Sequence, residues 1–175
     1  MEILENGAGP GWDEAVVIAL GGNLTGDYGS SEALLEAALA RFDQAGLPVL
    51  RRSGWWRSAA WPDPSQPEYR NAVAIVETRL EPRSVLHTLF SIEAEFNRNR
   101  GERNAPRTLD LDLIAHGRQV IDSEDLILPH PRAHQRLFVM GPLAEIAPDW
   151  RHPVLGLTAR ELAAGASVGC DARRA

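Results

Sequence analysis

An alternating pattern runs through Pro106-Arg107-Thr108-Leu109-Asp110-Leu111-Asp112-Leu113-Ile114 and predicts a β-strand. On a strand the side chains alternate between the two faces, so the three leucines would face the core together. Asp110 and Asp112 would then project from the opposite face, roughly 6.5–7 Å apart along the strand. Two ionised carboxylates at that spacing repel each other unless a positive group lies beside them, and Mg²⁺ is an apt partner because it takes oxygen ligands. The alternative is an amphipathic strand with a solvated acidic face.

Arginines gather on both sides of this acidic pair. The basic residues concerned are Arg98, Arg100, Arg103, Arg107, His130, Arg132, His134 and Arg136. A guanidinium group grips phosphate oxygens through two parallel hydrogen bonds and never loses its charge. Carboxylates for a metal beside arginines for phosphate are what phosphoryl or pyrophosphoryl transfer needs. A solvated cluster of cations at a helix end remains the alternative for the arginines that precede the pair.

Composition excludes several other chemistries. The chain has 175 residues, of which 44% are apolar and 24% charged, which suits one globular domain and excludes a mainly disordered chain. All 18 of its lysine-plus-arginine residues are arginine, so no P-loop lysine or Schiff-base lysine is present. The net charge of −6 argues against a nucleic-acid partner that would cover the whole surface.

The sequence also predicts where the protein resides. No stretch approaches the ~18 consecutive apolar residues of a membrane span, and the N-terminus lacks the basic start of a secretory signal. Cys170 is the only cysteine, so there is no internal disulfide. We therefore expect a cytoplasmic protein with no membrane partner.

Hydrophobic spacing and turn residues predict the order strand, helix, strand, strand, helix, strand. The expected segments are a strand at 15–20, a helix from Ser30 or Ser31, strands at 47–58 and 70–79, a helix from Pro82, and a strand at 108–115. Residues 136–140 are expected to form a strand or turn, and Thr158 to cap a short helix over 160–164. This order predicts an α+β fold with a ferredoxin-like βαββαβ core, an antiparallel sheet with helices on one face and a loop-rich C-terminal extension. The expected boundaries are a flexible N-terminal arm at 1–13, a single domain at 14–165 and a C-terminal tail at 166–175.

Other motifs are weaker evidence for a function when each is taken alone. The five histidines form no zinc-protease pattern, and His130 lies in a proline-rich loop that could aim it at a phosphate or could be merely structural. Trp55, Trp56, Trp61 and Tyr69 could stack on a flat heterocycle, although core packing is the usual role of such aromatics.

Several motifs in order resemble the 6-hydroxymethyl-7,8-dihydropterin pyrophosphokinase family. The string from Pro106 to Asp112 matches the signature of that family without a change. The other matching segments are Leu20-Gly21-Gly22-Asn23-Leu24, Gln66-Pro67-Glu68-Tyr69-Arg70-Asn71-Ala72, Ile92-Glu93, the arginine run, Leu128-Pro129-His130 and Arg136-Leu137-Phe138. The resemblance extends from about Val16 to Leu162, which is nearly the whole chain.

The resemblance implies a transferase of folate biosynthesis, which moves pyrophosphate from ATP to the hydroxymethyl group of the pterin and releases AMP. Asp110 and Asp112 would ligate two Mg²⁺ ions, and together with Arg98 and Arg100, on a loop that closes over ATP, they would be the catalytic residues. The implied nucleotide contacts are Glu93, Arg98, Arg100, Arg107, His130 and Arg136. The implied pterin contacts are Ser58, Ala60, Trp61, Tyr69, Asn71, Asp110 and Phe138, with Tyr69 and Phe138 on the two faces of the ring.

The chain departs from the family pattern at a few positions. Gly22 stands where the family usually has serine, and Ala59 and Ala60 stand where it has prolines. Asn104 stands where the family typically has tryptophan, which predicts looser closure over ATP and lower activity. A non-catalytic nucleotide-binding homologue is the alternative function, and an RNA-binding domain is disfavoured by the acidic charge. The expected partners are small molecules only, and the protein is expected to be a monomer or a homodimer.

Overall fold

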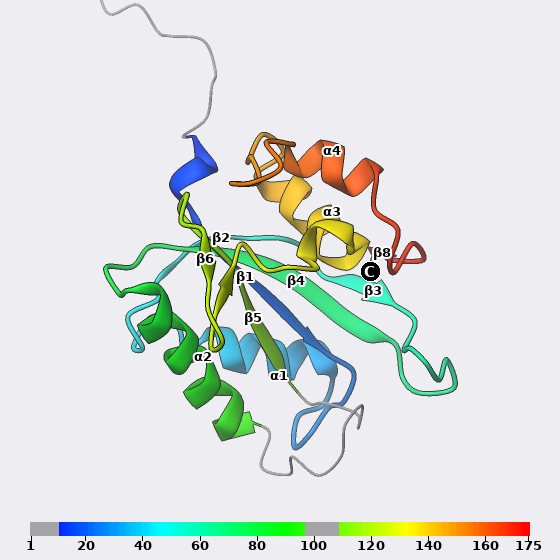
Figure 1. The fold of residues 1–175 in the computed structure, drawn as a ribbon. Coiled ribbons are helices and arrows are strands. Elements are labelled where there is room, and N and C mark those ends of the chain that lie inside the picture. Colours follow the sequence, from blue (N-terminus) through cyan, green and yellow to red (C-terminus); the bar gives the residue numbers. More distant parts are fainter. Residues whose placement is uncertain (1–10, 97–108) are drawn as a thin grey trace, which may run out of the picture.

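The computed structural model describes residues 11–96 and 109–175. Its main sheet consists of β1 (Val16–Gly22), β2 (Val49–Arg52), β3 (Trp56–Ser58), β4 (Tyr69–Val76), β5 (Asp110–His116) and β8 (Arg173–Arg174). The α-helices are α1 (Ser31–Leu39), α2 (Pro82–Phe96), α3 (Leu137–Ile146) and α4 (Ala159–Ala164). The strands are antiparallel in the order β5-β1-β4-β3-β8, with β2 also paired to β4 (Figure 1). The mixed helix and antiparallel-sheet class predicted from the sequence is therefore confirmed.

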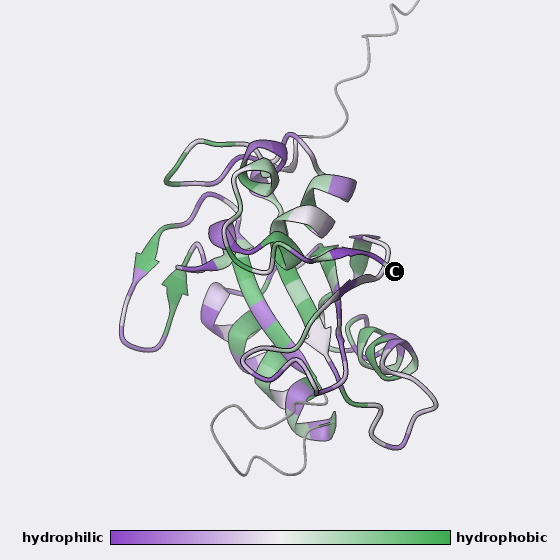
Figure 2. Ribbon diagram, turned by 90° about the vertical axis from the view of Figure 1, so that its right-hand side faces the viewer, coloured by the Kyte–Doolittle hydropathy of each residue, from purple (hydrophilic) through white to green (hydrophobic). Residues whose placement is uncertain are grey.

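Helices α1 and α2 cover one face of this sheet (Figure 1). The Ser30 side chain begins α1 as predicted, because its Oγ accepts a hydrogen bond from the backbone N–H of Ala33 at 3.1 Å. In α2 the buried Val85, Leu89 and Ile92 recur at helical spacing and form the stripe that packs against the sheet. The middle of the sheet is correspondingly hydrophobic in Figure 2.

Helices α3 and α4 lie over the opposite face of the sheet, so the prediction of helices on one face only is wrong. Of residues 136–140, expected to be a strand or turn, Arg136 is extended and bridges to Val168, whereas residues 137–140 begin α3 instead. Gly141 and Pro142 argue against a helix in the sequence, yet both lie inside α3. Gly141 is needed there, because a Cβ atom at this position would lie 2.6 Å from ring atoms of Trp56. The missing side chain lets α3 approach β3 closely.

The strand predicted at 47–58 is split into β2 and β3 at Ser53 and Gly54. The Oγ atom of Ser53 accepts a hydrogen bond from Val73 N–H at 3.0 Å, which keeps the interruption attached to β4. Glu145 of α3 accepts hydrogen bonds from Gly54 N–H at 2.8 Å and from Trp56 Nε1–H at 2.9 Å. The break in the strand is thus where the second helical layer is fastened to the sheet.

The two ends of the described chain also contact the fold. A short 3-10 helix, η1 (Trp12–Glu14), lies within the predicted arm, and Asp13 accepts a hydrogen bond from Arg151 N–H at 3.1 Å. The predicted C-terminal tail adds β8 to the edge of the sheet beside β3. A small second sheet pairs β6 (Ile121–Asp122) with β7 (Ile127–Leu128). Among the described residues, no helix has the length and apolar character needed to cross a membrane.

Candidate functional site

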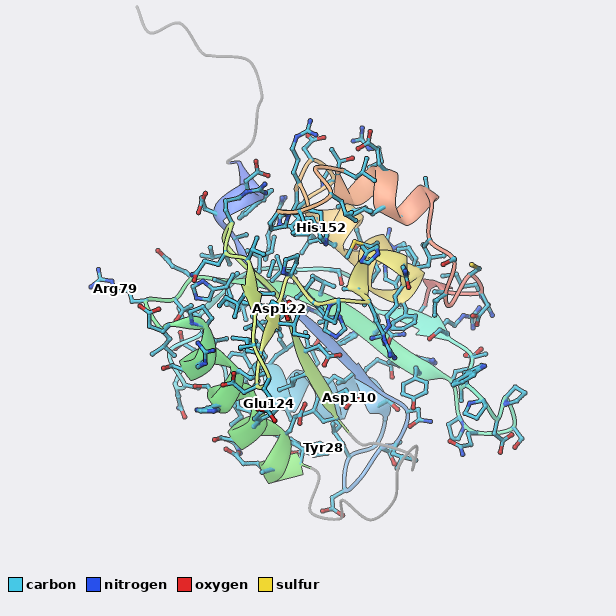
Figure 3. All side chains as sticks on the ribbon, in the orientation of Figure 1. Tyr28, Arg79, Asp110, Asp122, Glu124 and His152 are labelled. Atoms are coloured by element: carbon cyan, nitrogen blue, oxygen red, sulfur yellow. The ribbon has the colours of Figure 1, made fainter. Side chains whose placement is uncertain are left out.

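The register of the sheet brings the predicted site residues into two neighbouring rows. Asp110 lies opposite Gly21, which in turn lies opposite Asn71. Two residues along β5 and β1, Asp112 lies opposite Ala19. Figure 3 shows Asp110 at the start of β5. The predicted alternation is confirmed: Leu109, Leu111 and Leu113 are buried on the α1–α2 face, while Asp112 is exposed and Asp110 half-buried. The two carboxylates therefore lie on the face that carries α3.

A buried polar pair adjoins this acidic pair. Asn71 and Ser58 are only 6% and 5% exposed, and Asn71 Nδ2 donates a hydrogen bond to Ser58 Oγ at 3.0 Å. Gly21 makes room for the amide, because a Cβ atom there would lie 3.1 Å from Asn71 Oδ1. Tyr69 lies opposite Ser58 in the register. It precedes Asn71 by two residues on β4, so the two side chains lie on the same face of that strand. One end of the sheet thus carries carboxylates on β5 and an amide, a hydroxyl and an aromatic ring on β3 and β4.

Phe138 approaches the same face from α3. It is the second residue of that helix, which packs on the β4 face that carries Tyr69. The guanidinium of Arg136 lies 5.7 Å from the centre of the Phe138 ring, which is within cation–π range. The structure therefore places Tyr69 and Phe138 on facing layers, and it places Arg136 beside Phe138.

Glu93 is a buried carboxylate with a defined contact to β5. The residue is 7% exposed, and its Oε1 accepts a hydrogen bond from Leu111 N–H at 2.8 Å. Leu111 lies between Asp110 and Asp112 in the chain, so Glu93 of α2 fixes the strand that carries both carboxylates. The resemblance implied a nucleotide contact for Glu93, and this anchoring role is not visible in the sequence.

His130 lies beside the edge strand β5. Its backbone N–H donates to Ile114 O at 2.8 Å, and its ring Nδ1 accepts from Arg132 N–H at 3.1 Å. The pKa of His130 is lowered to about 4, mainly by burial and then by the positive charges of Arg136 and Arg132. The ring is therefore neutral at pH 7 and carries its proton on Nε2, where it can donate a hydrogen bond to an anionic oxygen.

The remaining predicted residues have different positions. Ala60 is buried, whereas Trp61 is 85% exposed and lies at the surface. Arg98, Arg100 and Arg107, together with the unusual Asn104, lie outside the described residues.

Two C-terminal residues that sequence reasoning missed also touch this region. Asp171 accepts a hydrogen bond from Ala59 N–H at 2.6 Å, and Gly169 lies against the ring of Phe138. Both fall in the segment expected to be a tail, and no motif marks them.

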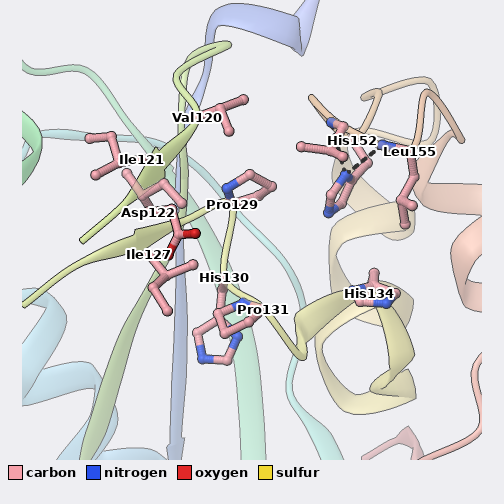
Figure 4. A pocket seen from close by; sticks show the side chains of 12 residues that line it. Val120, Ile121, Asp122, Ile127, Pro129, His130, Pro131, His134, His152 and Leu155 are labelled. Carbon is pink, nitrogen blue, oxygen red and sulfur yellow. Dashed lines mark hydrogen bonds between the residues drawn. The ribbon is translucent and has the colours of Figure 1, made fainter. Parts of the chain in front are cut away.

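A shallow pocket of about 300 Å³ lies between the β6–β7 hairpin and the loop at 152–155, and His130 is one of its lining residues (Figure 4). It is mostly apolar, and His134 and His152 line it with their ring centres 5.6 Å apart. His152 is 5% exposed, and its Nδ1 accepts hydrogen bonds from Val154 N–H and Leu155 N–H (Figure 4). The pKa of His152 is lowered to about 4, mainly by burial and then by the charges of His134 and Arg118.

These two histidines predict a loss of stability in mild acid. The pKa values of His130 and His152 are about 4 in the folded protein and about 6.5 in an unfolded chain. Between those values the unfolded chain binds more protons, so stability is fully present above pH 6.5 and falls as the pH drops toward 4. We expect His152→Asn, which keeps a hydrogen-bond acceptor but cannot titrate, to flatten the decline of Tm over this window. Thermal unfolding at half-unit pH steps measures it, and an unchanged slope would contradict the assignment.

Comparisons with known proteins show which family this chain resembles. The family model of 7,8-dihydro-6-hydroxymethylpterin-pyrophosphokinase (HPPK) matches residues 17–148. A Synechocystis 2-amino-4-hydroxy-6-hydroxymethyldihydropteridine pyrophosphokinase is 44% identical over 147 residues, which are 83% of this chain and 73% of the relative. The Bacillus subtilis protein of the same name is 38% identical over 130 residues, which are 74% of this chain and 75% of the relative.

A solved structure supports the fold independently. The structure of Plasmodium falciparum HPPK-DHPS superimposes with a TM-score of 0.66 at 13% identity, over 86% of this chain and 43% of that one. The likeness at that identity concerns the fold alone, and this chain spans less than half of that longer protein. The match of the family model over most of the chain, together with the identity to the two bacterial relatives, is sufficient: the chain belongs to the 7,8-dihydro-6-hydroxymethylpterin-pyrophosphokinase family.

Proposed function

We propose that this protein transfers pyrophosphate from ATP to 6-hydroxymethyl-7,8-dihydropterin and releases AMP, as a step of folate biosynthesis. The observation that carries the proposal is the register of β5, β1 and β4, which aligns Asp110, Gly21 and Asn71 and so sets the carboxylate pair beside a buried polar pair on one face of the sheet. The pterin hydroxyl oxygen bonds to the β-phosphorus, and the bond from that phosphorus to the oxygen bridging to the α-phosphorus breaks. The hydroxyl proton leaves to solvent, and AMP is the leaving group.

Asp110 and Asp112 fit the role of magnesium ligands. In the described part of the chain, no three His, Cys, Asp or Glu side chains group so that they could hold a metal ion together. Mg²⁺ does not need such a group, since it is commonly held by one or two carboxylates while substrate phosphates and water complete its octahedron. Two Mg²⁺ ions, when bound, would neutralise charge on the ATP phosphates. The carboxylates themselves would set where the phosphate chain lies, because β5 is fixed by Glu93.

The pterin would bind where the polar pair and the aromatic rings converge. Asn71 and Ser58 would read the polar edge of the heterocycle, and the backbone near Ala60 and Trp61 would supply further hydrogen bonds. Tyr69 and Phe138 would stack on its two faces. The burial of the Asn71–Ser58 pair supports this arrangement, because a preformed hydrogen bond fixes the orientation of the amide before the ligand arrives.

The nucleotide would bind on the side of β5. Neutral His130 would donate its Nε2–H to a phosphate oxygen, and Arg136 would supply positive charge beside it. We propose from the family pattern that Arg98 and Arg100 act as catalytic residues and that Arg107 contacts the nucleotide. Glu93 accepts a hydrogen bond from Leu111 N–H. We propose from the family pattern that it also contacts the nucleotide.

The organisation of the molecule belongs to the same proposal. The strand order β5-β1-β4-β3 supports a ferredoxin-like core, to which α3 and α4 are added on the second face. We propose a single domain over residues 14–165, small-molecule substrates without a nucleic acid or membrane partner, a cytoplasmic location, and a monomer or homodimer.

The purified protein tests the proposal directly. We expect AMP to form from ATP and Mg²⁺ only when 6-hydroxymethyl-7,8-dihydropterin is present, and we expect EDTA to abolish it. AMP and the pyrophosphorylated pterin are measured together by chromatography, because the reaction requires one of each per turnover. ATP binding without pterin-dependent AMP would contradict the proposal and favour a non-catalytic nucleotide-binding homologue.

A further inference from the structure

The C-terminal strap, defined here as residues 167–175, crosses from the start of α3 to β3. At one end, Leu137 N–H donates to Val168 O at 2.9 Å, and Val168 N–H donates to Gln135 O at 2.9 Å. At the other end, β8 pairs with β3, and Ala175 N–H donates to Trp55 O at 2.8 Å. The strap therefore joins the two elements that carry opposite sides of the proposed pterin site.

Between its two anchors the strap contacts one aromatic wall of that site. Gly169 has a φ of +66°, and a Cβ atom on it would overlap the ring of Phe138. A residue with a side chain would be both strained in this backbone conformation and sterically blocked. The backbone of Gly169 thus lies directly on the ring and limits where Phe138 can move.

The same turn contacts the loop on the opposite side. Asp171 Oδ2 accepts a hydrogen bond from Ala59 N–H at 2.6 Å, which is a short, charge-assisted contact. The turn is itself well held, because Ala172 N–H donates to Gly169 O at 2.9 Å and Ala172 is buried. Asp171 is therefore presented to Ala59 from a fixed support.

The loop that Asp171 holds lies at the surface, and its ion pairs with the fold are at its far end, where Glu68 pairs with Arg70 at 3.5 Å and with Arg173 at 3.9 Å. Residues 59–68 are almost all exposed, and Ala60 is the one that is buried. At the far end of the loop, Asn23 Nδ2 donates to Pro67 O at 3.2 Å. Ala59 has no side chain beyond Cβ with which to fix its own position. The contact with Asp171 is what holds the near end of the loop, immediately before Ala60.

We propose that Gly169 and Asp171 are positioning residues for the pterin site, Gly169 through the ring of Phe138 and Asp171 through the backbone of Ala59. The strap sets the distance between the Phe138 ring and the loop at Ala59 before the pterin binds. The pterin ring would then enter a site whose width is already fixed. This inference rests on the proposed function, since it assigns the strap to the site at which the pterin binds.

Asp171→Ala tests the contact with Ala59. We expect the KM for the pterin and its Kd to rise about tenfold, because a hydrogen bond to a charged acceptor is lost. The KM for ATP and kcat should stay within about twofold, since the hydrogen bond of Asp171 is to Ala59 on the pterin side, whereas the contacts of the strap near Arg136 are made by Val168 and are left intact. Asp171→Asn keeps an acceptor oxygen and should restore the pterin KM to within about threefold of the unmodified protein. Cys170→Ser is the matched control, because Cys170 is the exposed neighbour of Asp171 and its Sγ–H donates to Ala166 O instead of contacting Ala59.

Gly169→Ala tests the other contact independently. We expect it to weaken pterin binding with little change in ATP binding, because the added methyl group must displace the Phe138 ring. Pterin Kd values are measured by fluorescence titration in the presence of a non-hydrolysable ATP analogue, and thermal unfolding checks that each variant is folded.

The outcomes separate this inference from the proposed function. If the unmodified protein neither binds nor turns over the pterin, the proposed function itself fails. If the unmodified protein is active but Asp171→Ala and Gly169→Ala match Cys170→Ser, the function stands and the strap inference is overturned. A fall in Tm with equal losses for ATP and pterin would also overturn it, because that pattern indicates a general structural role.

Discussion

Asp112→Asn is expected to lower pterin-dependent AMP formation by about 10³-fold, because the change removes a charged ligand worth several kcal/mol of transition-state stabilisation. The substitution is nearly isosteric, and Asp112 is exposed on β5, so the fold should be retained. Asp110→Asn should have a comparable effect, and the double variant should be little worse than either one, since both carboxylates would serve the same metal–phosphate cluster.

Asp122→Asn is the matched control for these variants. Asp122 is also an exposed aspartate on a strand, but it lies on β6 in the separate small sheet. It should keep full activity. AMP formation is followed at several Mg²⁺ concentrations, and Asp112→Asn should show a reduced dependence on Mg²⁺ as well as a reduced rate. Full activity in Asp112→Asn would contradict the proposed metal site.

The strand that carries the acidic pair could be predicted because its pattern is local. Alternation of leucine and aspartate from Leu109 to Leu113 specifies which face is buried, and the structure confirms it. The N-terminal end of α1 could be predicted for the same reason, since a serine cap acts within its own helical turn.

Within the second helical layer, α4 could be predicted from its Thr158 cap, whereas α3 could not, because what makes α3 a helix lies elsewhere in the chain. Gly141 and Pro142 both disfavour a helix locally, but the close contact with Trp56 and the hydrogen bonds of Glu145 to Gly54 and Trp56 outweigh that preference. Such contacts join positions about ninety residues apart. Sequence periodicity reports only on neighbours, so it cannot reveal them.

In the candidate site, too, the residues could be predicted from local motifs, whereas the contacts between distant residues could not. Motif resemblance named Asn71 and Ser58 separately, but only the register reveals that they hydrogen-bond to each other beside Gly21. No sequence motif marks Asp171, because its partner is a backbone N–H group. Any residue other than proline supplies such a group, so the identity of Ala59 gives no indication of the contact.

Glu93→Ala is expected to have the second-largest effect, because it acts on both stability and activity. The change leaves the N–H of Leu111 without its buried acceptor and opens a cavity beneath β5, which should cost about 2–4 kcal/mol of unfolding free energy. The strand between Asp110 and Asp112 would then be free to shift, and small misplacements of reacting groups cost ~10²-fold in rate. Glu93→Gln keeps an acceptor oxygen and should recover most of both losses.

Glu95→Ala is the control on the same helix. Glu95 is 53% exposed and pairs with Arg41 at 3.2 Å, and such surface ion pairs contribute only about 0–1 kcal/mol. Denaturant unfolding, hydrogen exchange at the Leu111 amide and AMP formation are measured on all three variants. If Glu93 acts by holding β5, faster exchange at Leu111 and slower AMP formation must occur together in Glu93→Ala. A variant that loses activity while the Leu111 amide stays protected would contradict that role, and it would instead favour a direct contact between this carboxylate and the nucleotide.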